Sequence, residues 1–468
     1  MTYNLILDTD SYKASHWLQY PAGTEQISSY IEARGGPYEE GVFFGLQAFL
    51  KRYLTTPFTQ RDIDEAEAIF TAHGEPFNRH GWEHRLHNHQ GLLPIEIEAL
   101  PEGTRFPMRC AVLQVINTDP ACAWLVPYIE TALLRAVWYP STVASHSAAC
   151  KNTLKHYLQE TADTLEKMPF MLHDFGARGV SSLESAELGG LAHLVNFMGT
   201  DTVPALLAAR RYYGENMAAF SIPAAEHSTV ILWGREQEIE AYQHIISRFL
   251  SHGKLVSVVS DSYDYWKAID IWRGPLRDQI RDSGGTLVIR PDSDDPTTMI
   301  PETLSRLAEG FGADTNSKGY RVLNPCVRLI QGDGVSLEKI GEILEVMKNA
   351  GWSAENIVFG MGGELLQKVH RDTMRWAMKP SAAKIGGVWR EVFKNPATDP
   401  EKASKAGILA VIEDADGRLK TVKKNGGWHD RNYLRAVFRN GRLLRESSFV
   451  QVRKLTNQFE QAFGQAST

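Results

Sequence analysis

The sequence predicts an α/β protein that combines an irregular β/α barrel with a discontinuous α+β domain. Four apolar runs carry this prediction, and they begin near Leu255, Leu287, Val327 and Ile357. Each run is rich in Val, Ile and Leu with little polar alternation, which is typical of parallel strands buried on both faces. Each run ends in a polar or glycine-rich cluster. The carboxyl ends of parallel strands meet at one rim of a barrel, so these clusters are expected to lie together.

The predicted domain boundaries lie where the alternation of strands and helices begins and ends. Strand, polar loop and helix alternate from Met171 to about Val369, with roughly seven strand-like segments, about the number expected of a barrel or near-barrel. We expect residues 1–168 to form the first part of an α+β domain and residues 169–375 the catalytic barrel. Residues 376–468 would complete the first domain.

The flanking segments contain shorter elements. We expect strands at 3–8 and 26–32, helices at 43–53 and 62–73, and an antiparallel hairpin within 92–107. The apolar stretch 121–139 predicts a long buried helix, and a further helix lies within 145–168. Near the C-terminus, residues 407–422 predict a hairpin that turns at Asp416-Gly417.

Composition limits the class of protein. The net charge is −6, from 50 basic and 56 acidic residues, and no basic tail or stripe favours nucleic-acid binding. The N-terminus lacks a basic region before its short apolar run, and no stretch approaches the ~18 apolar residues of a membrane span. The four cysteines show neither metal nor disulfide spacing. A reduced, cytoplasmic protein without membrane contact is expected.

Three aspartates follow the buried runs: Asp261, Asp292 and Asp333. Carboxylates at one rim can hold Mg²⁺ or bind ribose hydroxyls, with Asp261 and Asp292 as the metal candidates. The alternative is that each aspartate caps a helix. Arg290 among them favours a binding site.

Glycine pairs at the same rim predict phosphate contact. Gly332 and Gly334 flank Asp333, and Gly362-Gly363 ends the last run, so the backbone there can approach a ligand closely. Glycine pairs also mark ordinary turns.

Other segments offer rings, charges and a histidine. Phe175 can stack on a heterocycle and Arg178 can bind phosphate, or they are a core ring and a surface charge. His227, near a helix start after Ser221, is either a buried structural histidine or a nucleophile or phosphate ligand. Asp10, Tyr12 and Lys13 bring an acid, a ring and a base together, either as part of a binding site or as an ordinary capped helix start. Arg371 and Lys379 could simply lie on a solvent-exposed helix face.

Together these segments resemble the nicotinamide phosphoribosyltransferase family of type II phosphoribosyltransferases. The matching stretches include DTDSYKASH, HDFGARGVSS, HLVNFMGTDT, SIPAAEHST, SVVSDSYD, VIRPDS, IQGDGV and ENIVFGMGGELLQK, in the family's order and over nearly the whole chain. The resemblance implies a barrel of the type II phosphoribosyltransferase kind. It also implies a homodimer with shared active sites, nicotinamide and phosphoribosyl pyrophosphate as substrates, Mg²⁺, and ATP as an activating co-substrate.

The resemblance also implies roles for individual residues. Phe175 and the Tyr12 of a partner subunit would sandwich the pyridine ring, while Asp201 would accept a hydrogen bond from the carboxamide. Arg290 would contact the amide oxygen and the phosphate region, and His227 would be phosphorylated by ATP. The ribose and phosphate groups would be held by Asp292, Gly332, Asp333, Gly362, Gly363 and Arg178, with Asp10, Ser221, Arg34, Arg371, Lys379, Lys394 and Lys402 completing the set.

The reaction so implied is attack of the pyridine nitrogen on C1 of phosphoribosyl pyrophosphate, which needs no strong base. A carboxylate at Asp201 favours nicotinamide, because nicotinate would bring a second carboxylate beside it. The alternatives are a nicotinate phosphoribosyltransferase, a barrel enzyme such as an aldolase, or a non-catalytic binding protein. No lysine at the four strand ends supports Schiff-base chemistry.

Overall fold

A computed structural model describes residues 3–292, 294–398, 403–424 and 431–463 of the chain. The chain divides into two units. The first consists of Met1–Ser145, Ala208–Asn216 and Val369–Thr468, and the second of His146–Leu207 and Met217–Lys368. The first unit therefore takes its segments from both chain ends, as predicted for a discontinuous domain.

The second unit is built on a parallel sheet that contains all four predicted apolar runs. Its strand order is β7-β6-β13-β12-β9-β8, and every pairing is parallel. The strands are β6 (Leu172–Asp174), β7 (Gly199–Thr200), β8 (Leu255–Val259), β9 (Thr286–Arg290), β12 (Val327–Gln331) and β13 (Ile357–Met361). Most of their residues are buried, as the lack of polar alternation predicted.

A short irregular segment joins the two edges of this sheet. Phe220 forms a parallel bridge with Gly199 of β7, and Ala224 forms one with Ser257 of β8. The backbone bonds are Thr200 N to Phe220 O (3.2 Å) and Ser257 N to Pro223 O (2.9 Å). The sheet and this segment thus form a closed ring, which confirms the irregular barrel.

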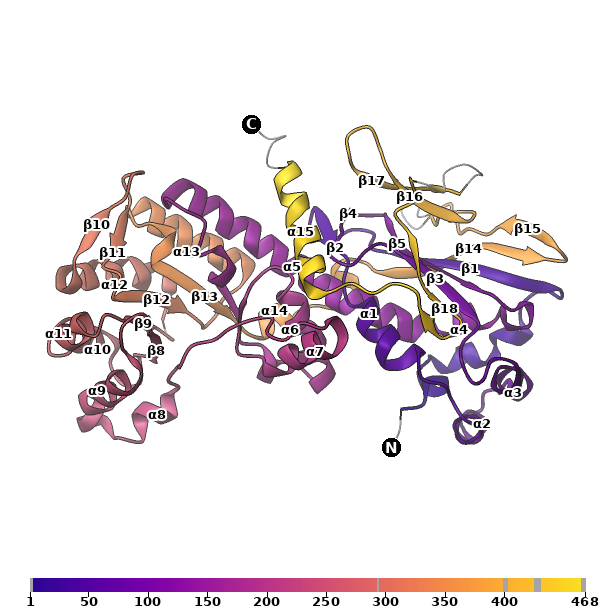
Figure 1. The fold of residues 1–468 in the computed structure, drawn as a ribbon, viewed down its shortest axis with the longest axis horizontal. Coiled ribbons are helices and arrows are strands. Elements are labelled where there is room, and N and C mark those ends of the chain that lie inside the picture. The colour runs from indigo at the N-terminus through magenta and orange to yellow at the C-terminus, as the bar shows by residue number, and fades with distance from the viewer. Residues whose placement is uncertain (1–2, 293, 399–402, 425–430, 464–468) are drawn as a thin grey trace. The chain divides into compact units, whose positions relative to one another are not determined.

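Helices follow the strands and lie around the outside of the sheet (Figure 1). They are α6 (Leu183–His193), α8 (His227–Ile231), α9 (Glu238–Phe249), α10 (Tyr265–Arg273), α11 (Arg277–Asp282), α12 (Pro296–Phe311), α13 (Leu337–Asn349) and α14 (Gly363–Leu366). The helix α7 (Val203–Tyr213) begins in this unit, and its residues from Ala208 onward belong to the first unit. A small hairpin of β10 (Ala313–Thr315) and β11 (Arg321–Leu323) follows α12.

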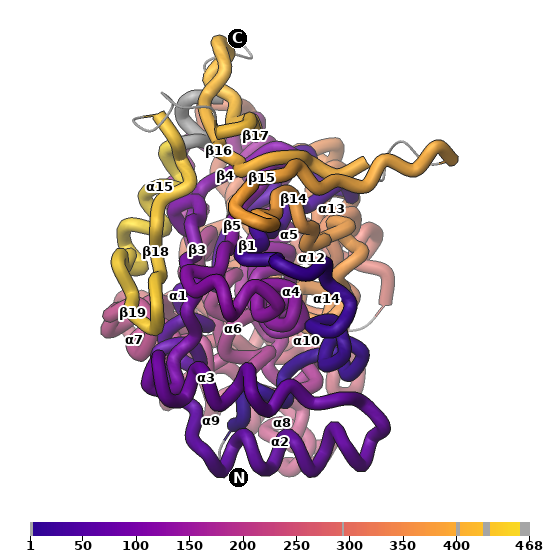
Figure 2. The backbone as a smooth tube through the Cα atoms, turned by 90° about the vertical axis from the view of Figure 1, so that its right-hand side faces the viewer, coloured from indigo at the N-terminus to yellow at the C-terminus, as the bar shows by residue number. Residues whose placement is uncertain are grey.

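The first unit is built on an antiparallel sheet of order β15-β14-β1-β5-β3-β18-β19. Its strands come from both chain ends: β1 (Thr24–Glu32), β3 (Ile95–Ala99), β5 (Ala111–Asn117), β14 (Ala377–Ile385), β15 (Val388–Glu391), β18 (Arg435–Arg439) and β19 (Arg442–Leu443). The helices are α1 (Leu46–Phe49), continued by a π-helical turn at Leu50–Leu54, α2 (Gln60–His73), α3 (Arg79–Asn88), α4 (Leu125–Tyr128) and α15 (Phe449–Phe463). Figure 2 shows α2 and α3 next to one another, in contact.

Several predicted elements of this unit are confirmed. The strand at 26–32 is β1, and the helices at 43–53 and 62–73 are α1 with its π turn and α2. The predicted C-terminal hairpin is β16 (Leu409–Glu413) paired antiparallel with β17 (Leu419–Lys423), and Gly417 takes the positive φ of +76° that its turn requires.

The strand predicted at 3–8 is wrong. Leu5–Leu7 form a 3-10 turn, because the Asn4 side chain accepts a hydrogen bond from Ile6 N at 3.0 Å. A side chain that caps its own backbone offers the chain an alternative to a sheet.

The hairpin predicted within 92–107 is also wrong. Its two strands exist as β3 and β4 (Arg105–Pro107), but β3 pairs with β5 and β18, while β4 pairs with β2 (Glu40–Val42). Both edges of β3 are thus occupied by strands distant in sequence.

The helix predicted at 121–139 is divided differently. A break at Ile129 separates α4 from α5 (Glu130–Thr161), and α5 continues through Pro140 into the helix predicted within 145–168. Tertiary contacts hold α5 together near the proline: the Ser141 hydroxyl bonds Phe44, and Ser145 Oγ accepts from Val42 N at 2.8 Å. No helix in the described ranges is long and apolar enough to cross a membrane.

Candidate functional site

The carboxyl ends of the parallel strands place the predicted residues at one rim of the barrel. Phe175 follows β6 and Asp201 follows β7, while Asp261, Asp292 and Asp333 follow β8, β9 and β12. Because all six strands are parallel, these positions share the same end of the ring.

The ring of Phe175 packs against two glycines of neighbouring strands. Phe175 N donates to Met361 O at 2.9 Å, and a Cβ on Gly360 would lie only 2.0 Å from Phe175 Cε2. A Cβ on Gly332 would lie 3.5 Å from the same ring atom, 3.6 Å from Arg290 Cδ and 3.8 Å from Asp292 Oδ1. The structure thus brings Phe175, Arg290, Asp292 and Gly332 together.

Asp201, which follows the strand next to β6, is hydrogen-bonded to Ser221. Asp201 N donates to Asp174 O at 2.9 Å, and Ser221 Oγ donates to Asp201 Oδ1 at 2.5 Å. The Asp201 side chain is exposed, and its charge partly opposes the lowering of the His173 pKa that burial causes. One Asp201 oxygen is thus oriented by Ser221, which leaves the other for a ligand.

Asp174 holds the backbone on both sides of this site, since it bonds both Gly176 N and Asp201 N. Its carboxylate is fully buried and accepts a hydrogen bond from Gly176 N at 2.7 Å. Burial raises the pKa of Asp174 to about 6, and the hydrogen bonds oppose that shift. Sequence reasoning missed Asp174 and Gly360 as positioning residues. A glycine inside a strand signals a close approach and could have revealed Gly360.

The alternative that the rim aspartates are helix caps is wrong for all three. The side chains that cap α10, α12 and α13 belong to Asp264, Asp295 and Ser336, which accept from Lys267 N, Thr297 N and Lys339 N. Asp261, Asp292 and Asp333 each lie three residues before the corresponding cap. None of the three carboxylates is therefore used to cap these helices.

Two of these aspartates are paired, one with a histidine and one with an arginine. His227 is the first residue of α8, and its Nε2 lies 3.0 Å from Asp261 Oδ1. Arg290 Nε lies 3.7 Å from Asp292 Oδ1 and has no hydrogen-bond partner within the described ranges. Burial raises the pKa of Asp292; Arg290 opposes the shift, and the negative charge of Asp261 adds to it.

The donor set at the rim fits Mg²⁺. Asp261 and Asp292 offer carboxylate oxygens, the ligands that Mg²⁺ prefers, and their charges act on one another. Asp261 Oδ1 is hydrogen-bonded to His227, whereas Asp292 has only the longer contact with Arg290, so Asp292 has more oxygen atoms available for a metal ion.

The glycines of the last strand lie close to the loop after Phe175. A Cβ on Gly179 would lie 3.1 Å from Gly363 Cα, and one on Gly362 would lie 3.7 Å from Phe175 O. Arg178 in this loop and Asp333 on the neighbouring turn are exposed. The two loops thus approach each other closely, and two exposed charges lie nearby.

A second set of predicted residues belongs to the first unit. Lys379 on β14 pairs with Tyr30 of β1, and burial lowers the pKa of Lys379, with Arg34, Lys394 and Lys13 adding to the shift. These cations thus act on one another. Arg371 is exposed and lies 3.0 Å from Asp372. Lys402 lies outside the described residues.

The N-terminal segment of the same unit presents Tyr12 and Asp10. Tyr12 is exposed on the 3-10 helix Ser11–Leu18, with its ring 5.0 Å from that of His16. Asp10 Oδ2 accepts from Thr131 Oγ1 at 2.6 Å. Lys13 is buried and paired with Glu130 at 2.9 Å, so of this segment the tyrosine ring is the group free to contact a ligand.

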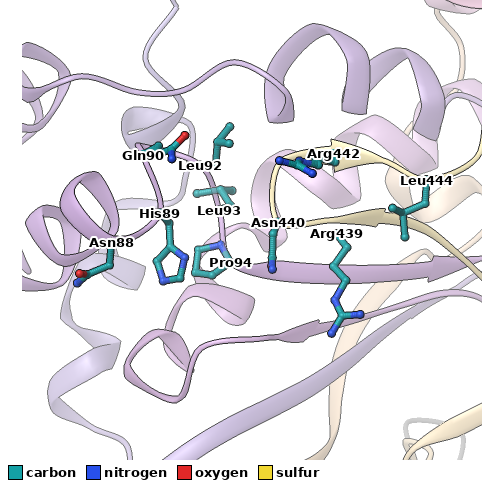
Figure 3. A pocket seen from close by; sticks show the side chains of 10 residues that line it. All are labelled: Asn88, His89, Gln90, Leu92, Leu93, Pro94, Arg439, Asn440, Arg442 and Leu444. Carbon is teal, nitrogen blue, oxygen red and sulfur yellow. The ribbon is translucent and has the colours of Figure 1, made fainter.

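A cavity of about 440 Å³ also belongs to the first unit (Figure 3). It lies between the segment after α3 and the β18–β19 hairpin, and its ionisable lining residues are His89, Arg439 and Arg442. None of the predicted site residues lines it.

Comparisons with known proteins agree with this geometry. The sequence profile of the nicotinate phosphoribosyltransferase (NAPRTase) family matches residues 170–442, and that of the nicotinamide phosphoribosyltransferase N-terminal domain matches residues 4–97. A nicotinamide phosphoribosyltransferase of Xanthomonas campestris is 50% identical over 458 residues, which cover 96% of this chain and 97% of the relative. The chain belongs to the nicotinamide phosphoribosyltransferase family. A second relative of that name, from Acinetobacter baylyi, is 33% identical over 96% of this chain and 97% of its own length.

Solved structures share the fold at low sequence identity. A nicotinate-nucleotide pyrophosphorylase from Pyrococcus furiosus has a TM-score of 0.64 at 16% identity and covers 99% of this chain and 98% of its own. Human nicotinic acid phosphoribosyltransferase has a TM-score of 0.60 at 16% identity and covers 97% of this chain and 93% of its own.

Proposed function

We propose that this chain transfers the phosphoribosyl group of phosphoribosyl pyrophosphate to nicotinamide, giving nicotinamide mononucleotide and pyrophosphate for NAD biosynthesis. The observation that carries the proposal is the convergence of Phe175, Arg290, Asp292 and Gly332 at one rim, with Asp201 beside them. The relatives with 50% and 33% identity carry the same activity in their names.

The ring pocket supports an aromatic base. Phe175 rests on Gly360, which has no side chain to displace it, so one face of the phenyl ring can stack on a pyridine. The exposed Tyr12 of a partner subunit would cover the other face, as the family resemblance implies.

Asp201 selects the amide over the acid. Its free oxygen can accept a hydrogen bond from the carboxamide N–H, while nicotinate would place a carboxylate there. Two such charges about 4 Å apart repel by roughly 1 kcal/mol in water and 4 kcal/mol at an effective dielectric constant of 20. Asp201 is exposed in the chain alone, so the penalty lies between these limits and rises as the substrate excludes water.

The transfer itself needs orientation and charge stabilisation. The lone pair of the pyridine nitrogen forms a bond to C1 of the ribose, and the C1–O bond breaks with its electron pair leaving on pyrophosphate. No proton moves, and the ring becomes a pyridinium. Arg290 and Arg178 stabilise the departing charge, while Asp292, Asp333 and the backbone at Gly332, Gly362 and Gly363 hold the ribose and its 5′-phosphate.

Asp292 and Asp261 would hold Mg²⁺ at the same rim. The ion supplies neutralisation of the pyrophosphate charge when bound. From the family resemblance, the residues proposed to surround the phosphate groups, some of them from the partner subunit, are Arg34, Lys379, Lys394, Lys402 and Arg371.

His227 is the proposed acceptor of phosphate from ATP. Its Nε2 faces Asp261, so a proton on Nε2 leaves the lone pair of Nδ1 to attack the γ-phosphorus. The bond to ADP breaks with its electron pair, and water later hydrolyses the phosphohistidine. This ATP step, the Mg²⁺ requirement, the homodimer with shared sites and the cytoplasmic location rest on the sequence and its family resemblance.

The test is product formation by the purified chain with phosphoribosyl pyrophosphate, nicotinamide, Mg²⁺ and ATP. Phe175→Ala should lower kcat/KM, since it removes the stacking surface. Phe170→Ala is the matched control, because Phe170 precedes β6 at the opposite end of the barrel. Failure to make nicotinamide mononucleotide, or equal losses in the two variants, would refute the proposal.

A further inference from the structure

Four side chains that can bind a metal meet in the first unit, outside the predicted site. They are His84, His89, Asp119 and Cys122, and their ligand atoms all lie within 4.8 Å of one another. Asp119 Oδ2 lies 2.8 Å from His84 Nε2 and 2.6 Å from His89 Nε2. The Cys122 thiol completes the group from a fully buried position.

Two short sequence motifs supply these four groups. His84 lies in the last turns of α3, and His89 is its C-terminal cap. Asp119 caps the 3-10 turn Pro120–Cys122 by accepting from Ala121 N at 2.9 Å, and Cys122 ends that turn. The His-x₄-His spacing falls within the His-x₃₋₅-His of structural zinc sites, and Asp119 and Cys122 are separated by two residues, as the ligands of a Cys-x₂-Cys pair are. The cysteine pattern alone gave no such signal, because the partners of Cys122 are an aspartate and two histidines.

The arrangement is close to a tetrahedral shell. With Zn–N of about 2.0 Å and Zn–S of about 2.3 Å, neighbouring ligand atoms lie roughly 3.3–3.5 Å apart. The two histidine nitrogens, at 2.8 and 2.6 Å, would move slightly away from Asp119 Oδ2, and all four ligand atoms already lie within 4.8 Å of one another. Asn88 Nδ2 lies 2.8 Å from His84 Nδ1; with the amide flipped, Asn88 Oδ1 would accept from the Nδ1–H of a zinc-bound His84 and orient the ring, as outer partners of metal ligands do.

A buried cation, Arg85, lies beside the four ligand groups. Arg85 is fully buried over the rings of Trp82 (3.6 Å) and Trp124 (4.4 Å), and none of its nitrogens has a hydrogen-bond partner among the described residues. A Zn²⁺ ion with one thiolate and one carboxylate is neutral, so the filled site does not repel Arg85.

We propose that His84, His89, Asp119 and Cys122 bind one Zn²⁺ ion. Mixed nitrogen, oxygen and sulfur ligands suit Zn²⁺, and four protein ligands make a closed, structural site. The ion links the C-terminal end of α3 to the turn that follows β5. His89 also lines the cavity between α3 and the β18–β19 hairpin, which gives the ion a path from solvent (Figure 3).

The test uses the purified full-length chain. After removal of loosely bound metal, mass spectrometry should find one zinc per chain, and the apoprotein should take up one equivalent on titration. Co²⁺ in its place should give the intense visible bands of a tetrahedral ion and a sulfur-to-cobalt charge-transfer band. Neither measurement needs a variant to fold.

Variants then assign the ligands. Cys122→Ser should abolish the charge-transfer band, and His84→Ala should weaken Zn²⁺ binding by at least about 100-fold, since loss of outer partners alone costs 10–100-fold. The controls are His87→Ala, an exposed histidine of the same helix, and Cys110→Ser, a buried cysteine of the same unit. Both controls should bind as the wild type does. Absence of uptake by the wild-type apoprotein, or full binding by the Cys122 and His84 variants, would show a hydrogen-bonded His–Asp–His cluster only and overturn the proposal.

Discussion

Gly360→Ala tests whether the Phe175 ring depends on the missing side chain beneath it. The added Cβ would lie 2.0 Å from Phe175 Cε2, and ordinary contact begins at 3.4 Å, so the ring must move by about 1.4 Å. Overpacking of this kind costs about 1–3 kcal/mol. At roughly 2–4 °C per kcal/mol for a unit of this size, Tm should fall by several degrees.

The same displacement should weaken binding of the base. A stacked aromatic pair contributes about 0.5–1.5 kcal/mol, so KM for nicotinamide should rise roughly two- to twelve-fold. Steady-state kinetics with phosphoribosyl pyrophosphate held at saturation measure the change in KM, and thermal unfolding measures the fall in Tm.

A double-mutant cycle separates the ring contact from other effects of the strand. With Phe175→Ala already present, Gly360→Ala should cost little, because the ring that it displaces is gone. Gly332→Ala is the stability control, since its Cβ would meet the same ring at an ordinary 3.5 Å. Equal costs of Gly360→Ala with and without Phe175 would refute the packing argument.

Three further predictions concern Asp201, His227 and Glu102. Asp201→Asn should reduce the preference for nicotinamide over nicotinate by about five-fold to 10³-fold, and an unchanged ratio of kcat/KM values would contradict the charge argument. His227→Ala should abolish incorporation of phosphate from labelled ATP, while His244→Ala, an exposed histidine on α9, should not; label retained in the first variant would exclude His227 as the acceptor. Burial raises the pKa of Glu102 to about 7, above its ordinary value of 4.5, so the stability it contributes is present at low pH and lost as pH rises through 7. Unfolding in urea should show about 2–3 kcal/mol less stability at pH 8 than at pH 5 from this group, and the same pH dependence in Glu102→Gln would contradict the assignment.

Local sequence patterns were sufficient to predict the barrel strands. The runs beginning at Leu255, Leu287, Val327 and Ile357 are β8, β9, β12 and β13, because strands buried on both faces must be apolar throughout. Their shared direction then brought the residues after each strand to one rim without knowledge of the helices between them.

Non-local pairing could not be predicted in the same way. A hairpin was predicted within 92–107, but β3 lies between β5 and β18, and β18 is more than 300 residues later in the chain. Local alternation contains no information about such a partner. The continuation of α5 through Pro140 likewise depends on tertiary contacts with Phe44 and Val42.

In the site, too, the positions of residues were predictable from local sequence, whereas contacts between distant segments were not. The sequence identified which residues lie at the rim, but the contact of Phe175 with Gly360 and the hydrogen bond from Ser221 to Asp201 depend on side-chain packing across strands. The helix-cap alternative for the rim aspartates was also open, until the structure assigned the caps to Asp264, Asp295 and Ser336.

The central claim is that the Phe175 and Asp201 pocket directs phosphoribosyl transfer to nicotinamide. The most direct measurement is kcat/KM of the wild-type chain for nicotinamide and for nicotinate, assayed in parallel with phosphoribosyl pyrophosphate, Mg²⁺ and ATP. We predict nicotinamide mononucleotide as the main product, with a much lower value for nicotinate. Equal values, or a preference for nicotinate, would contradict the role assigned to Asp201.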